Sequence, residues 1–231
     1  MVQNLFIKSD RGASLVSVAE LYFSTDGIRG NVPCPPLRQV LIVPLATLRT
    51  YHLGPSDLRE NIVLDYDPLH SLSSGTTLAV GEALIRLTFH CEPCNQIKDK
   101  VSVSKIAHNR GYLGCFLNEG VIKLNDSASV TDRQHEAIPY NLSERIAWYL
   151  DRQSQPVSIK SLLREVGLSL SYARAVPNLL KKLPTKYKDM VMFASSTPNE
   201  TPNHALQRTA TRVTVAADSG LGVFTPSHLS S

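Results

Sequence analysis

Short apolar runs separated by turn-forming residues fill the first 130 residues of the chain. Residues 40–43 are apolar throughout, which is typical of a strand that is buried on both faces. The other runs lie at residues 5–7, 15–23, 77–80, 84–89 and 121–124. Many short strands at close spacing are typical of a barrel or a sandwich. We therefore predict a mainly β domain over residues 1–130.

The pattern changes to helical spacing after Pro139. Asn141 or Ser143 is a suitable N-cap for a helix that continues through Trp148 and Leu150. Ser158 can begin a second helix over 159–166, which Gly167 would end.

A third helix would begin at Ser169 or Ser171, although Pro177 would interrupt it. Helix, glycine-containing turn and helix is the outline of a helix-turn-helix, and a strand at 190–194 would give a winged version. We predict a small α-helical, winged-helix-like domain over 138–194.

The remaining residues, 195–231, are rich in Thr, Ser, Pro, Asn and Ala, and we expect a disordered tail. The composition, 42% hydrophobic and 19% charged, is ordinary for a globular protein. No apolar run approaches the roughly 20 residues that a transmembrane helix needs, and the N-terminus lacks the design of a secretion signal. We expect a cytoplasmic protein without a membrane partner.

The chain has four cysteines, Cys34, Cys91, Cys94 and Cys115, which is too few for a disulfide framework at this length. The spacing of Cys91 and Cys94 leaves three interpretations open. They can be small buried residues, which their spacing alone favours. They can form a redox dithiol, or they can bind zinc together with His90, Cys34, Cys115 or His108. No second ligand pair at short spacing supports the zinc site.

An ordered series of motifs surrounds Cys94 and resembles the MOSC (molybdenum-cofactor-sulfurase C-terminal) family over about half of the chain. The series begins at the glycine turn 26–31 and continues through 38–42 and 54–62, which includes Arg59-Glu60-Asn61. It continues with 72–76, Val-Gly-Glu-Ala-Leu at 80–84, Glu92-Pro93-Cys94, 110–114 and 121–124. The chain departs from the family pattern at Asn31-Val32-Pro33-Cys34, where the family often has an Asp followed by a His, and at Cys91.

This resemblance implies a β-barrel-like fold and a functional thiol at Cys94, which would carry persulfide sulfur or ligate the molybdenum of a pterin cofactor. Thiolate sulfur is a suitable ligand for a soft metal. The resemblance also implies an anion-binding pocket for a molybdopterin or a pyridoxal phosphate-type ligand. Its cofactor-binding residues would be Arg59, Glu60, Asn61, Glu92, Pro93, Lys8 and Arg110.

The function predicted from these residues is sulfur transfer or molybdenum-pterin-linked redox chemistry. The enzyme would then be a sulfurtransferase or a molybdenum-cofactor-dependent oxidoreductase, and its partner would be a cysteine desulfurase or a redox protein. Alone, Arg59-Glu60-Asn61 would more simply be a surface ion pair and a turn residue.

A second hypothesis is a regulator that senses a ligand in the barrel and binds DNA. Residues 141–190 hold nine Lys and Arg against four Asp and Glu, and this segment carries the basic excess of the chain. Its third helix would present Tyr172 and Arg174 to the major groove, with Lys181 and Lys182 near phosphates.

Overall fold

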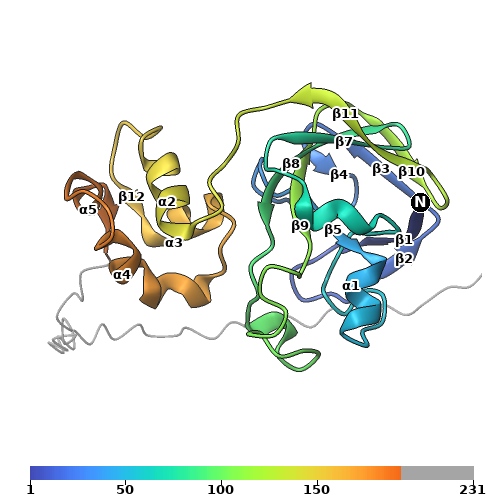
Figure 1. Cartoon of the computed structure of the whole chain (residues 1–231), viewed down its shortest axis with the longest axis horizontal. Helices are drawn as coiled ribbons and strands as arrows, with labels where there is room; N and C mark the ends of the chain where they lie inside the picture. The colour runs from blue at the N-terminus through green and yellow to red at the C-terminus, as the bar shows by residue number, and fades with distance from the viewer. Residues whose placement is uncertain (194–231) are drawn as a thin grey trace, which may run out of the picture. The chain divides into compact units, whose positions relative to one another are not determined.

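The structure is a computed structural model and describes residues 1–193. Strands dominate its first 134 residues, so the predicted mainly β fold is confirmed (Figure 1). In the order in which neighbours pair, the main sheet consists of β11 (Ala128–Gln134), β7 (Thr76–Val80), β8 (Ala83–His90), β9 (Tyr112–Phe116), β5 (Val40–Pro44), β6 (Ile62–Leu64), β1 (Val2–Ile7) and β2 (Val16–Val18). A second sheet has the order β10 (Gly120–Lys123), β3 (Glu20–Ser24) and β4 (Gly27–Ile28).

The strand β5 is buried on both faces of the main sheet. Val40 and Ile42 belong to one hydrophobic cluster, whereas Leu41 and Val43 belong to another. Because successive side chains of a strand point to opposite faces, a strand covered on both sides needs apolar residues at every position. The prediction of two-sided burial for residues 40–43 is confirmed.

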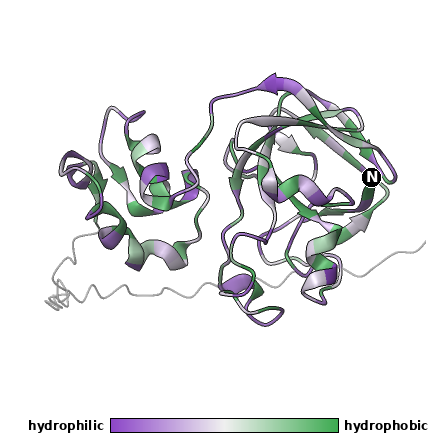
Figure 2. Cartoon of the chain, in the orientation of Figure 1, coloured by the Kyte–Doolittle hydropathy of each residue, from purple (hydrophilic) through white to green (hydrophobic). Residues whose placement is uncertain are grey.

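The main sheet curls around the first of these clusters, which also takes Leu21, Phe23 and Ile122 from the second sheet (Figure 1). One edge strand, β11, is mostly exposed. Figure 2 shows that its end is hydrophilic. Charged residues such as Asp132 and Arg133 on an edge strand discourage pairing with other chains.

The helices are short. They are α1 (Leu45–Thr50), α2 (Leu142–Leu150), α3 (Ile159–Glu165), α4 (Val176–Leu180) and α5 (Lys186–Asp189), with 3-10 helices at Asp67–Ser71, Asn95–Ile97 and Leu170–Ala175. Two predicted N-caps are confirmed. Asn141 Oδ1 accepts the N–H of Ser143 at 2.9 Å before α2, and Ser158 Oγ accepts the N–H of Ser161 at 3.1 Å before α3.

The winged-helix arrangement is not confirmed. The predicted third helix is instead a 3-10 helix followed by α4, and Pro177 lies in the first turn of α4, where its missing N–H breaks no helical hydrogen bond. The strand expected near residue 191 exists as β13 (Val191–Met192). It pairs in parallel with β12 (Val157–Ser158), which precedes α3, and does not form a hairpin wing.

The residues from 142 to 193, which we call the helical segment, have a hydrophobic cluster of their own. Its buried members lie between Ile146 and Val191. Among the described residues, no helix is long and apolar enough to cross a membrane. The tail predicted over 195–231 lies outside the described residues.

Candidate thiol site

The loop that carries Cys94 leaves the end of β8. The N–H of Cys91 donates a hydrogen bond to the carbonyl of Gly111 at 2.8 Å, which fixes the start of the loop against β9. Cys94 follows Pro93 directly and precedes the 3-10 helix Asn95–Ile97. The residue as a whole is 7% exposed. The sequence and the backbone therefore place this thiol just below the surface at the end of a buried strand.

Arg110 is the charged group that contacts the thiol. Its guanidinium donates to Cys94 Sγ at 3.2 Å, to the carbonyl of Glu92 at 2.9 Å and to the carbonyl of Leu58 at 3.2 Å. A hydrogen bond from a fixed positive charge stabilises a thiolate more than a thiol. Arg110 therefore joins the Cys94 loop to the loop before β6 and places a positive charge against Cys94 Sγ.

The two cysteines of the loop have different environments. Cys91 belongs to an apolar cluster with Phe89 and Leu113, and burial raises the pKa of its thiol. Cys94 lies outside the three hydrophobic clusters and receives the hydrogen bond from Arg110. Cys91 thus fits the interpretation as a core residue, whereas Cys94 is the thiol with an activating contact.

Gly111 sets the position of Arg110. Its φ of +127° is a conformation that L side chains rarely adopt, and a Cβ there would lie 2.5 Å from the carbonyl oxygen of Ile42. A glycine lets β9 approach β5 closely at this point. The preceding residue, Arg110, is thereby brought within reach of the thiol.

The motif Arg59-Glu60-Asn61 lies on the loop that Arg110 contacts through Leu58. Glu60 is fully buried, and its Oε1 accepts the N–H of Ser56 at 2.6 Å. Burial raises the pKa of Glu60, and its Oε2 is buried without a partner. Arg59 is only half-buried and has a φ of +66°.

Asn61 ties three parts of the sheet together. Its Oδ1 accepts the N–H of Leu41 at 3.1 Å, and its Nδ2 donates to the carbonyl of Phe6 at 3.2 Å. These contacts give the Asn61 amide a structural role, because they join the start of β6 to β5 and β1. A surface ion pair and a turn, the simpler interpretation of the motif, do not describe these buried residues.

Lys8 lies at the end of β1, and its Nζ donates to the carbonyl of Arg11 at 2.7 Å. Burial lowers the pKa of Lys8, and the charge of Arg59 lowers it further. The charge of Cys34 acts in the opposite direction and raises that pKa. Cys34 lines a cavity of about 320 Å³ at the glycine turn, together with Ser24, Asp26, Gly27, Ile28, Arg29, Asn31, Val32, Pro33 and Gln39.

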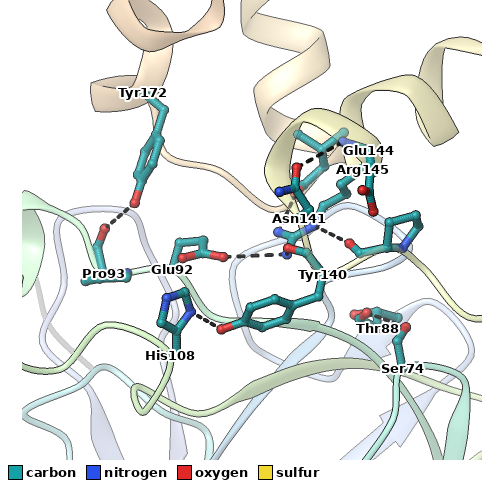
Figure 3. A network of polar contacts seen from close by, with 12 residues as sticks. Ser74, Thr88, Glu92, Pro93, His108, Tyr140, Asn141, Glu144, Arg145 and Tyr172 are labelled. Carbon is teal, nitrogen blue, oxygen red and sulfur yellow. Dashed lines mark hydrogen bonds and ion pairs between the residues drawn. The ribbon is translucent and has the colours of Figure 1, made fainter. Parts of the chain in front are cut away.

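The helical segment holds the Cys94 loop through two contacts that the sequence did not reveal. Arg145 of α2 forms a buried ion pair with Glu92 at 3.5 Å, and Tyr172 donates from its hydroxyl to the carbonyl of Pro93 at 3.2 Å (Figure 3). Arg145 also donates to the carbonyls of Pro139, Tyr140 and Val166. The only sequence signal was a charged residue beside Ile146 on the apolar face of a predicted helix.

The residues predicted to bind DNA differ in their exposure. Tyr172 is half-buried and bonded to the Cys94 loop, whereas Arg174, Lys181 and Lys182 are exposed. Lys181 donates to Asn178 Oδ1 at 3.2 Å. The contacts of the helical segment with the barrel give the DNA-binding alternative no support.

All four cysteines are free thiols. Within residues 1–193, no group of three or more His, Cys, Asp or Glu side chains is placed to hold a metal ion. The zinc interpretation of Cys91 and Cys94 therefore gains no support from the part of the chain that the structure describes.

Residues 37–128, which include the Cys94 loop and Arg110, match the family model of the MOSC domain. This part of the chain is therefore similar to the MOSC domain. Members of this family are linked to the molybdenum cofactor or to sulfur chemistry. No curated protein matches the sequence.

Three solved structures resemble this chain. They are the YuaD protein from Bacillus subtilis (16% identity, TM-score 0.49, covering 58% of this chain and 96% of that chain), YiiM from Escherichia coli (20%, 0.46, 79% and 94%) and YiiM from Geobacillus stearothermophilus (15%, 0.48, 78% and 100%).

Proposed function

We propose that this protein is a sulfur carrier in which Cys94 holds a persulfide. The observation that carries the proposal is the contact of Arg110 with Cys94 Sγ at 3.2 Å. A guanidinium fixed by two backbone carbonyls remains in place to stabilise an anionic sulfur, either a thiolate or a persulfide.

The transfer step needs only one nucleophile on this chain. The Cys94 thiolate attacks the outer sulfur of a persulfide on a donor such as a cysteine desulfurase. A new S–S bond forms at Cys94, the S–S bond of the donor breaks, and the donor cysteine leaves as a thiolate. Arg110 stabilises the negative sulfur before and after the step.

Molybdopterin is the larger group that the family suggests, and the surroundings of Cys94 can be compared with it. Cys94 is 7% exposed, and it lines neither the cavity at the glycine turn nor a second cavity of about 320 Å³ that His90 and Tyr112 line. So buried a residue does not fit a bulky metal–pterin at its thiol. We therefore derive no step through molybdenum, and nothing in the structure favours a pyridoxal phosphate-type ligand.

The test is to incubate the full chain with a cysteine desulfurase and L-cysteine, and then to locate sulfane sulfur by peptide mass spectrometry. We expect persulfide on Cys94 of the wild type and on Cys94 of Cys91→Ser, the matched control in the same loop. Cys94→Ser should carry none. An equal amount of sulfane sulfur on Cys94→Ser would refute the proposal, and so would an unmodified wild type.

A further inference from the structure

The turn that precedes β6, residues 54–60, supplies one of the carbonyl groups that hold Arg110. Its Leu58 carbonyl accepts a hydrogen bond from the guanidinium at 3.2 Å, and the same guanidinium donates to Cys94 Sγ at 3.2 Å. The side chain of Leu58 is fully buried and belongs to an apolar cluster, which anchors this point of the turn. A shift of the turn would therefore move the guanidinium relative to the thiol.

A second contact joins the turn to the loop that carries Cys94. Asp57 forms an ion pair with Lys100 at 2.8 Å, and Asp57 Oδ2 also accepts the N–H of Gly54 at 2.9 Å. The ion pair is partly exposed, so it contributes little stability by itself. Together with the hydrogen bond at Leu58, it fixes the turn against the loop at two points.

Two residues of the turn have a strained backbone. Ser56 has a φ of +78° and Arg59 has a φ of +66°, a left-handed conformation that such residues seldom adopt. Strain of this kind persists only where the surrounding structure enforces it. Two hydrogen bonds within the turn do so. Glu60 Oε1 accepts the N–H of Ser56 at 2.6 Å, and the carbonyl of Ser56 accepts the N–H of Arg59 at 2.9 Å.

Glu60 is a costly side chain with which to close a turn. It is fully buried, and its Oε2 has no hydrogen-bond partner among the described residues. Burial raises its pKa, although hydrogen bonds from the backbone of the turn oppose this shift. A buried carboxyl that is only partly bonded destabilises a fold. What Glu60 contributes in return is the conformation of the turn, and Leu58 lies between its two strained residues.

We propose that Glu60 is a positioning residue for the reaction of Cys94. Its Oε1 holds the N–H of Ser56 and thereby the carbonyl of Leu58, and that carbonyl holds Arg110 against the thiol. The inference rests on the proposed function, which makes Cys94 the reactive thiol. Because Arg110 is the residue that contacts the sulfur, the effect of Glu60 reaches the thiol through Arg110.

The test compares two conservative variants of the full chain by the rate at which iodoacetamide alkylates Cys94, read from peptide mass spectrometry over time. Glu60→Gln loses the charge and keeps an acceptor for Ser56, so it should react at the wild-type rate. Glu60→Asp keeps the charge and withdraws the acceptor by one methylene, so it should react about three- to tenfold more slowly. A wild-type rate in Glu60→Asp, or equal slowing in Glu60→Gln, would overturn the proposal.

A second comparison separates positioning from general destabilisation. In Arg110→Met the guanidinium is absent, so adding Glu60→Asp should slow alkylation no further. The same slowing in both backgrounds would show that Glu60 acts independently of Arg110 and would overturn the proposal. Gln39→Met is the control. It removes the hydrogen bonds of another buried side chain, with Thr25 and Phe116, and should leave the rate at Cys94 unchanged.

Persulfide loading by a cysteine desulfurase and L-cysteine, measured on the same variants, distinguishes this proposal from the sulfur-carrier proposal. If only the sulfur-carrier proposal fails, wild-type Cys94 carries no persulfide and the alkylation rates still rank as expected. If only the positioning role fails, the wild type loads persulfide, and Glu60→Asp loads and alkylates as fast as the wild type. Alkylation of the half-buried Cys34 should be equal in all variants, which shows that each is folded.

Discussion

At the scale of single residues, one guanidinium distinguishes Cys94 from its neighbour Cys91. The two thiols are three positions apart and almost equally buried, at 7% and 8% exposure. Burial raises the pKa of Cys91, although the charge of Arg110 acts against that shift. What Cys94 has and Cys91 lacks is a hydrogen bond from Arg110, and under the proposed function this contact is what makes Cys94 the reactive thiol, because a desolvated thiol without a nearby cation is inert.

Replacing Arg110 with methionine should slow the alkylation of Cys94 by iodoacetamide about tenfold, because a thiolate loses about 1.4 kcal/mol or more of stabilisation when a charged hydrogen bond is removed. Rates at Cys94 are read from peptide mass spectrometry over time. Arg29→Met, at an exposed arginine next to the ring of Tyr22, is the control and should leave the rate unchanged. An unchanged rate in Arg110→Met would show that the guanidinium does not activate the thiol.

Gly111 is the second single residue on which the site depends. Gly111→Ala should lower the free energy of unfolding by about 2 kcal/mol or more, since its φ is +127° and the added Cβ would meet Ile42 oxygen at 2.5 Å. Gly12→Ala, where a Cβ meets nothing within 4 Å, is the matched control and should change stability by less than about 0.5 kcal/mol. Urea denaturation measures both. Equal effects of the two substitutions would contradict the role of Gly111.

At the scale of elements, α2 and the 3-10 helix Leu170–Ala175 each contact the thiol loop, through Arg145 and Tyr172. Glu92 lies between the two cysteines, and its only charged partner in the described chain is Arg145. Burial raises the pKa of Glu92 and lowers that of Arg145, so burial disfavours the charged form of each group. Such a pair adds little stability by itself, yet removing one partner leaves a buried charge uncompensated.

A double-mutant cycle on this pair should show strong coupling. We expect Arg145→Met to cost about 3–5 kcal/mol, because the loss also frees three backbone carbonyls, and Glu92→Gln to cost about 2 kcal/mol. The double variant should lose at least about 1 kcal/mol less than the sum. The free energies come from urea denaturation.

The exposed pair of Arg152 and Glu136 offers the control cycle, with Arg152→Met and Glu136→Gln. Exposed ion pairs contribute little, so its coupling should be below about 1 kcal/mol. If the buried pair coupled no more strongly than this exposed one, the helical segment would not depend on Glu92 to hold the loop.

At the scale of the whole molecule, the sequence predicted the longer apolar runs and missed the short or interrupted ones. β5 was predicted because its run is uninterrupted, and β8 was predicted although Arg86 and Thr88 lie within it. β6 is apolar but has only three residues, β9 is interrupted by Gly114, and β11 is a polar edge strand.

The candidate thiol and Arg110 followed from the ordered motifs of the family. The pairing of Glu92 with Arg145 could not be read from the chain, because the partners are more than 50 positions apart and meet only when the helical segment packs against the loop. The cavity lined by His90, Tyr112 and Arg145 could not be predicted from the sequence for the same reason. It needs residues from β8, from β9 and from the connection before α2, whose proximity is a property of the tertiary structure.

The last prediction concerns how the free energy of unfolding depends on pH. This dependence reports whether the buried ring of His90 is neutral in the folded protein. The pKa of His90 is about 4 in the folded protein, against 6.5 for an ordinary histidine. Between these values the unfolded chain binds more protons than the folded one, so lowering the pH favours unfolding. The contribution of the neutral ring is fully present above about pH 6.5 and is lost progressively as the pH falls toward about 4.

The contributions of Glu60 and Glu92 to stability change with pH in the opposite direction. Their pKa values are raised in the folded protein, so the folded state takes up protons before the unfolded state as the pH falls. A comparison of the wild type with His90→Phe cancels these carboxyl groups. Between about pH 7.5 and about pH 5, the wild type should lose about 1–2 kcal/mol more stability than the variant, once partial solvent screening is allowed for. Urea denaturation at the two pH values measures this difference. Equal losses of stability in both proteins would mean that the pKa of His90 in the folded protein is that of an ordinary histidine.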